Sequence, residues 1–126
     1  MKALIIVDLQ YDFLPGGKLA VPHGDEIIKR INELQAKFEL IIATQDWHPE
    51  KHQSFASQHP NNQVFDIVDL QGYPQTLWPD HCVQGTKGAE LSHELHQNKL
   101  SAIIRKGMNP SIDSYSAFFD NNHQRK

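Results

Sequence analysis

The chain has little of what would place it outside the cell, in a membrane or on a nucleic acid. Its 126 residues include one cysteine, Cys82, so no disulfide can form within the chain and a reducing compartment is indicated. The first apolar run, residues 3–7, ends at Asp8 and is too short for a signal-peptide core or a membrane span. The net charge is −3, without a run of like charges. We therefore expect a cytoplasmic protein that binds neither membrane nor nucleic acid.

Three short apolar runs indicate strands of an α/β domain. The first is continuously apolar, the other two are largely so, and they are rich in β-branched side chains, as in parallel strands that are covered on both faces. The runs are residues 3–7, 40–44 and 100–104. Helical patterns separate them, which is the βαβ rhythm of a parallel sheet flanked by helices. The length fits a single domain over residues 1–126.

Two segments have helical patterns, and a long segment between them has none. Apolar residues recur at helical spacing from Ile27 to Phe38, with Asp25 and Glu26 in the first turn, where the helix dipole favours acidic groups. Residues 89–95 predict a short helix. The stretch from residue 46 to residue 88 is polar and aromatic, and a loop of this length in a compact domain is usually functional.

Charged side chains follow each of the three predicted strands. These are Asp8, Asp46 and Lys106. Since ligands of open α/β sheets bind beyond the carboxyl ends of the strands, we expect the three groups on one rim. Asp8 could act there as a general base or could only cap a turn. Lys106 could stabilise an anion or could be an ordinary solvated lysine.

Asp46, His48 and His81 form a candidate metal site. Asp46 and His48 are two residues apart, and His81 lies in a second segment that is also flanked by tryptophan and proline. Three such ligands leave coordination positions open, as in catalytic rather than structural metal sites. The alternative is surface or hydrogen-bonded histidines. His52 could be a fourth ligand, whereas the other histidines lie in polar surroundings typical of the surface.

The aromatic residues and the cysteine each allow two interpretations. Phe13, Trp47, Phe55, Trp78 and Tyr115 could line a pocket for a flat ring, or could belong to the core, as aromatic residues more often do. Cys82 adjoins His81 in sequence, but catalytic Cys/His pairs are neighbours in space rather than in sequence. We expect Cys82 to be a buried thiol without a chemical role.

Seven motifs in order along the chain resemble the nicotinamidase/pyrazinamidase family of isochorismatase-like cysteine hydrolases. They are ALIIVDLQYDF (3–13), GGKLAVP (16–22), TQDWHP (44–49), SFAS (54–57), LWPDHCVQ (77–84), RKG (105–107) and DSYSAF (113–118). The resemblance extends over essentially the whole chain. It implies a three-layer, Rossmann-like α/β fold and the hydrolysis of nicotinamide to nicotinate and ammonia in NAD salvage, with pyrazinamide as a further small-molecule substrate.

The resemblance also implies the roles of site residues. Asp8 would be the catalytic base and Lys106 the cation of a triad in which a cysteine thiolate attacks the carboxamide and forms a thioester. One divalent metal ion, zinc before iron or manganese, would be held by Asp46, His48 and His81, with waters or His52 completing its shell. The ring would be bound by three aromatic residues, Phe13, Trp78 and Tyr115.

One departure from the family is large. The nucleophilic cysteine of the family lies beyond a further helix and strand, past position 126, and Cys82 matches a different, non-nucleophilic position. The resemblance therefore implies an incomplete sheet with an unpaired edge at the first strand. We expect residues 1–126 alone to be inactive. Two alternatives stay open: a hydrolase of another small amide, and a non-catalytic metal- or ligand-binding fragment. The sequence leaves the oligomeric state undecided, and a homo-oligomer is compatible with it.

Overall fold

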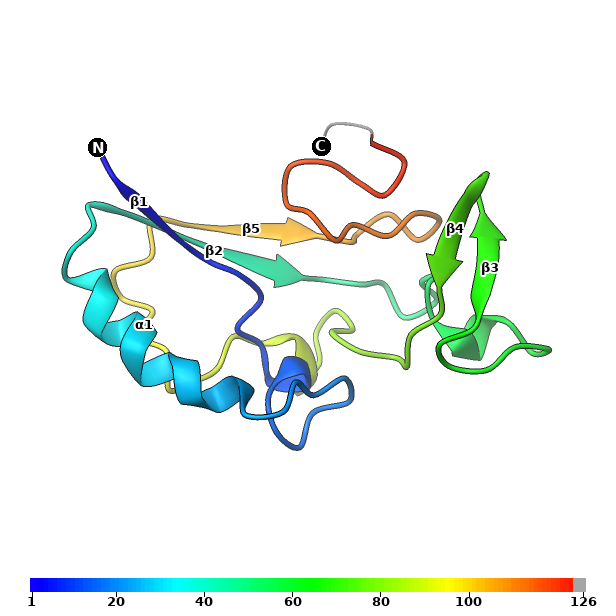
Figure 1. Ribbon diagram of the computed structural model, residues 1–126, viewed down its shortest axis with the longest axis horizontal. Helices are drawn as coiled ribbons and strands as arrows, with labels where there is room; N and C mark the ends of the chain where they lie inside the picture. The colour runs from blue at the N-terminus through cyan, green and yellow to red at the C-terminus, as the bar shows by residue number, and fades with distance from the viewer. Residues whose placement is uncertain (124–126) are drawn as a thin grey trace.

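The computed structural model describes residues 1–123 and contains a parallel three-stranded sheet (Figure 1). Its strands are β1 (Ala3–Ile6), β2 (Leu40–Asp46) and β5 (Ala102–Lys106), in the spatial order β1-β2-β5. All three predicted strands are confirmed, with β2 and β5 reaching two residues further than predicted. Residues 124–126, at the end of the predicted domain, lie outside the described residues. No helix among the described residues is long and apolar enough to cross a membrane.

One face of the sheet is covered by helix α1 (Ile27–Gln35). The helix begins after a short 3-10 helix, η2 (Gly24–Glu26), which contains the two acidic residues expected in its first turn. The side chains between helix and sheet form the core: Ile6, Leu9, Leu14, Ile28, Ile41, Ala43, Leu91 and Leu95. Each large side chain buried there stabilises the fold by about 1.5–3 kcal/mol. The packing on this face therefore holds helix α1 against the sheet.

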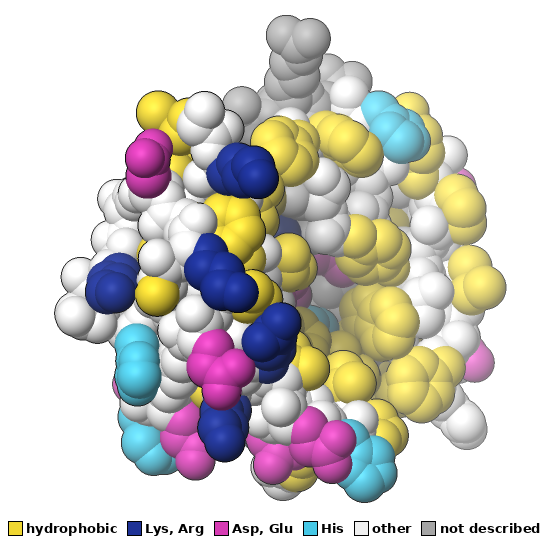
Figure 2. All heavy atoms as spheres, turned by 60° about the vertical axis from the view of Figure 1, so that its left-hand side comes forward, with side chains coloured by type: hydrophobic (Ala, Val, Ile, Leu, Met, Phe, Trp, Pro, Cys, Tyr) yellow, Lys and Arg dark blue, Asp and Glu magenta, His cyan; other side chains and the backbone are white. Residues whose placement is uncertain are grey.

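The opposite face of the sheet is open, which differs from the expectation of strands covered on both faces. Ile5 is 48% exposed, Val7 65% and Ile104 41%. Alternate residues of a strand point to opposite faces, so these side chains point away from α1. Among the described residues β1 pairs only with β2, which leaves its outer edge free as the resemblance implied. In Figure 2, which is turned by 60° from Figure 1, apolar side chains gather around a hollow in the surface.

The long segment between β2 and β5 contains a β-hairpin that the sequence analysis did not predict. Strands β3 (Ile67–Leu70) and β4 (Tyr73–Thr76) pair antiparallel. They are joined by Gln71 and Gly72, both at positive φ, as a tight hairpin turn requires. The sequence pattern did not predict β4 because it contains Pro74, and a proline inside a run of residues argues against a strand. Two further 3-10 helices, η3 (Ala56–Gln58) and η4 (Lys87–Ala89), flank this hairpin in sequence.

The predicted helix at residues 89–95 is wrong. After η4 the chain runs irregularly beside the segment that follows β1. The backbone N–H of Ser92 donates to the carbonyl of Leu9, and the N–H of Tyr11 donates to the carbonyl of Glu90. These bonds take the place of helical i to i−4 bonds, and they let Leu91 and Leu95 fill the core beneath the sheet.

Candidate metal and catalytic site

Asp8, Asp46 and Lys106 meet at the carboxyl ends of the three strands. Asp46 and Lys106 are direct partners in the β2–β5 register, and Asp8 lies two residues beyond β1. The Lys106 Nζ is 2.8 Å from Asp8 Oδ2, contacts Asp46 Oδ1, and donates to the carbonyl of Ser114 at 3.2 Å. The sheet therefore places one buried ammonium between two carboxylates.

The electrostatics of this group keep Lys106 and Asp46 charged. Burial disfavours the charged form of Lys106, but the Asp46 and Asp8 carboxylates outweigh it and raise the pKa of Lys106 above its ordinary value. Burial also opposes ionisation of Asp46, yet the neighbouring His48 imidazole and the charge of Lys106 lower the pKa of Asp46 to about 2. The Asp46 carboxylate and the Lys106 ammonium thus stabilise each other as ions.

Asp8 is held in a strained backbone conformation. Its φ is 50°, in the left-handed region that few residues other than glycine adopt. Thr44 holds it there, because the Asp8 N–H donates to the Thr44 carbonyl and the Thr44 hydroxyl donates to Asp8 Oδ1 at 2.6 Å. This leaves Oδ2 for Lys106. Strain of this kind clusters at functional sites, which fits the prediction that Asp8 has a chemical role.

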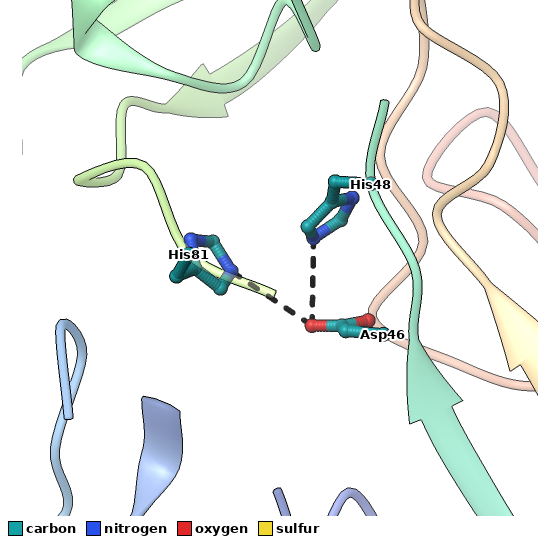
Figure 3. A group of neighbouring side chains, drawn as sticks. All are labelled: Asp46, His48 and His81. Atoms are coloured by element: carbon teal, nitrogen blue, oxygen red, sulfur yellow. Dashed lines mark ion pairs between the residues drawn. The ribbon is translucent and has the colours of Figure 1, made fainter. Parts of the chain in front are cut away.

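The predicted metal ligands converge on one carboxylate oxygen (Figure 3). Asp46 Oδ2 lies 3.5 Å from His48 Nε2 and 3.8 Å from His81 Nε2. The Nδ1 atom of His48 is 2.8 Å from the Gly107 carbonyl, and that of His81 is 2.7 Å from the Pro79 carbonyl. Carbonyls only accept hydrogen bonds, so each Nδ1 carries the proton and each Nε2 presents its lone pair.

These residues fit a divalent cation. His48 is fully buried, and its Nε2 has no hydrogen-bond partner among the described residues. The ligand atoms of Asp46, His48 and His81 all lie within 4.8 Å of one another. A buried imidazole nitrogen without a partner costs about 1–3 kcal/mol, and an ion at this point would remove that cost. The N and O donors suit zinc, iron or manganese.

His52 lies beside His48 but outside this set of three ligands. It groups instead with His48 and Asp113, whose ligand atoms are also within 4.8 Å of one another. The backbone N–H of Ser54 donates to His52 Nδ1 at 3.1 Å, which places the proton on Nε2. Burial lowers the pKa of His52 to about 4, so the ring is neutral. A protonated Nε2 has no lone pair for a metal, so this second group is the poorer site.

The strand-end group and the metal group open into the same cavity, of about 250 Å³. Seven of the eight predicted site residues line it, together with Leu19 and Asp113: Asp8, Phe13, Asp46, Trp78, His81, Lys106 and Tyr115. The eighth, His48, is buried behind them. A larger groove of about 690 Å³ lies beside α1, but its lining includes none of the eight. The smaller cavity is therefore the candidate site.

Two of the aromatic residues considered as pocket residues lie elsewhere. Phe55 is fully buried, and its ring centroid is 5.5 Å from those of His48 and His81. Trp47 stacks with the guanidinium of Arg105, 3.9 Å from the ring centroid. Phe13 and Trp78 do line the cavity, with Phe13 5.6 Å from the His81 ring. Phe55 therefore supports the histidines from behind.

Cys82 is a buried thiol, as expected. Burial, followed by the charge of Asp46, raises the pKa of Cys82 above its ordinary value. The thiolate is the nucleophilic form of cysteine, and this environment suppresses it.

Gly107 is required by the position of His48. Its φ is +66°, and a Cβ atom there would lie 2.4 Å from His48 Cε1. We expect Gly107→Ala to lower the free energy of unfolding by about 1–3 kcal/mol more than Gly72→Ala, because overpacking is added to backbone strain. Gly72, at φ +84°, is the matched control, since nothing lies within 4 Å of its Cβ position. Urea unfolding measures both variants, and equal losses would contradict the expectation.

The fold and the site together define a class of protein: a parallel α/β domain with a candidate metal site and an Asp–Lys pair at the ends of its strands. The chain matches the Isochorismatase domain over residues 2–124, and it belongs to this family.

Known proteins similar to this chain are longer than it is. The chain is 52% identical over 129 residues to the nicotinamidase of Escherichia coli (strain K12), covering 99% of the chain and 60% of that protein. It is similar to the solved structure of the Acinetobacter baumanii nicotinamidase pyrazinamidease (TM-score 0.95, 49% identity, 98% of the chain and 59% of that chain). It is also similar to the Pyrococcus horikoshii pyrazinamidase in complex with zinc (TM-score 0.72, 43% identity, 92% and 57%). The chain thus spans about three fifths of their length.

Proposed function

We propose that this chain supplies the general base, the lysine and the metal site of an amidohydrolase that converts nicotinamide to nicotinate and ammonia. One observation carries the proposal: a single cavity is lined by Asp8, Lys106, Asp46 and His81. The names of its relatives, which are nicotinamidases and pyrazinamidases, support the choice of substrate. The proposed setting is NAD salvage in the cytoplasm.

Asp8 is proposed to move the proton. Its carboxylate takes the proton of a cysteine thiol, the thiolate attacks the carboxamide carbon, and the proton is delivered to the departing ammonia as a thioester forms. Water then hydrolyses the thioester and releases nicotinate. Lys106, whose Nζ is 2.8 Å from Asp8 Oδ2, is proposed to hold this carboxylate in place for the first proton transfer. Since Cys82 is fully buried, we propose that the thiol comes from a polypeptide segment outside residues 1–126.

The metal is proposed to orient the substrate. Asp46, His48 and His81 would hold the ion, which when bound would fix the ring nitrogen of nicotinamide and so act as a template. Zinc is the proposed ion, because a zinc-bound relative is known and the donor set suits it. Phe13 and Trp78, with Tyr115 6.4 Å from the Trp78 ring, would enclose the ring.

The proposal is tested by comparing nicotinamide with benzamide, which lacks the ring nitrogen. We expect the zinc-loaded chain to bind nicotinamide at least about tenfold more tightly by calorimetry, a difference of about 1.4 kcal/mol. Chelation of the metal should abolish the preference. Equal binding of the two amides would overturn the assigned role of the metal. Residues 1–126 alone should release no ammonia from nicotinamide, and release that Cys82→Ala abolishes would overturn the assignment of an external thiol.

Zinc affinity is expected to fall as the pH is lowered. Burial lowers the pKa of His48, but the Asp46 carboxylate beside it outweighs this effect and raises the pKa of His48 above its ordinary value in the ion-free chain. Burial lowers the pKa of His81, which therefore stays neutral. Below the pKa of His48 one proton competes with the metal, and affinity should drop about tenfold per pH unit. Titrations between pH 8 and pH 6 measure this, and a constant affinity would contradict it.

A further inference from the structure

The side chains of Gln10 and Asp12, to which the sequence analysis assigned no role, lie in one short segment. One contacts the backbone of Asp46, and the other contacts the loop that carries His81. Gln10 and Asp12 lie just after β1, at the start of the 3-10 helix η1 (Tyr11–Phe13). Gln10 is fully buried and Asp12 is 6% exposed. Buried polar groups are normally hydrogen-bonded, and the polar atoms of both side chains bond to backbone groups of other segments.

The Gln10 side chain clamps the backbone of Asp46. Its Nε2 donates to the Asp46 carbonyl at 2.8 Å, and its Oε1 accepts from the Asp46 N–H at 2.8 Å. The second Nε2 proton goes to the Ala89 carbonyl, also at 2.8 Å. Both amide protons and the amide oxygen are thus used. This two-point contact fixes both the position and the direction of the Asp46 backbone.

The Asp12 side chain clamps the loop that carries His81. Its Oδ2 accepts the N–H of Cys82 at 2.8 Å, and Cys82 has a φ of 47°, which an unsupported cysteine rarely adopts. The Oδ1 accepts the N–H of Lys18 at 3.2 Å. The backbone of Gly88 lies so close that a Cβ there would be 2.1 Å from Oδ2. The residue next to His81 is therefore locked to the segment that holds Gln10.

We infer that Gln10 and Asp12 are positioning residues that set the separation between the metal ligands Asp46 and His81. These two ligands are 35 positions apart in sequence, and Asp46 Oδ2 must stay 3.8 Å from His81 Nε2 for one ion to reach both. A single three-residue segment bonds to the backbone of one ligand and to the neighbour of the other. The inference rests on the proposed metal site. It identifies Gln10 and Asp12 as residues that determine the zinc affinity of that site.

The test measures zinc affinity and the visible spectrum of bound Co²⁺, with the full chain. Gln10→Met and Asp12→Asn should each weaken zinc binding about 10–100-fold, the usual effect of residues that orient metal ligands. The Co²⁺ bands should shift, because the ligand geometry changes. A residue that only stabilises the fold would leave the spectrum of the folded variant unchanged. Circular dichroism establishes that each variant is folded, and Gln10→Glu provides a second variant with the same length.

Asp80→Asn is the matched control. Asp80 immediately precedes His81 but bonds outward, accepting from the Ser57 hydroxyl at 2.6 Å, so its replacement should change zinc affinity less than about threefold. Folded Gln10 and Asp12 variants that match Asp80→Asn in affinity and spectrum would overturn the inference. An unaltered chain that binds no zinc would instead overturn the proposed metal site, so the two failures are distinguishable.

Discussion

Replacing Lys106 with methionine is expected to lower the free energy of unfolding by about 3–5 kcal/mol, the usual cost of removing one partner of a buried ion pair. Lys106 is 3% exposed and contacts the carboxylates of Asp8 and Asp46. Methionine fills a similar volume but leaves the buried Asp46 carboxylate, and the partly buried Asp8 beside it, without a cation. Urea unfolding near neutral pH measures the loss.

The pH dependence identifies the cause of this loss. The pKa of Asp46 is lowered to about 2 in the folded chain, so its ionisation stabilises the fold above pH 4, and that contribution disappears as the pH falls toward 2. Without Lys106 the Asp46 carboxylate loses the cation that lowers its pKa, so the pKa of Asp46 rises. The difference between the variant and the unaltered chain should therefore shrink as the solution is acidified from pH 7 to pH 4.

Lys87→Met is the control for charge removal alone. Lys87 pairs with Glu90 at 3.1 Å on the surface, where side chains are 70% and 56% exposed. Such pairs contribute little, so the variant should unfold at nearly the same urea concentration as the unaltered chain. Similar losses at Lys87 and Lys106 would show that the buried position does not matter.

The sequence was sufficient for the sheet and for the rim of the site because both depend on local patterns. Continuous β-branched runs locate strands, and parallel strands bring the residues that follow them to one edge. Asp8, Asp46 and Lys106 could be placed together on this basis alone. The prediction that His48 and His81 join Asp46 rested on residue chemistry and on the flanking tryptophans and prolines, and the geometry in Figure 3 brings these ligand atoms together.

The parts that the sequence did not reveal depend on contacts between distant segments. Gln10 bonds to Asp46 across 36 positions, and Asp12 bonds to Cys82 across 70. In sequence each is an ordinary polar residue after a strand. The helix predicted at residues 89–95 failed for the same reason, since the Ser92 N–H and the Glu90 carbonyl bond to residues 9 and 11 and not within a helix. Local propensity is a weak guide where tertiary partners compete for the backbone.

The removal of the Phe55 ring is expected to damage both stability and metal binding. Phe55 is fully buried, and its centroid lies 5.5 Å from the His48 and His81 rings and 5.7 Å from that of His52. Phe55→Ala should lower the free energy of unfolding by about 3–5 kcal/mol, as buried phenylalanine truncations do, because the cavity cannot close around three fixed imidazoles. Without the Phe55 ring behind them, the His48 and His81 imidazoles should be less well oriented and should bind zinc less tightly.

Zinc separates these two effects of the Phe55→Ala substitution. A ligand that binds only the folded state stabilises it by an amount that grows with its affinity, so saturating zinc should stabilise the variant less than the unaltered chain. Urea unfolding with and without zinc measures both quantities. Phe118→Ala is the matched control, since that ring is 73% exposed and its loss should cost less than about 0.5 kcal/mol. If zinc stabilised both chains equally, Phe55 would be a core residue that leaves the metal ligands unaffected.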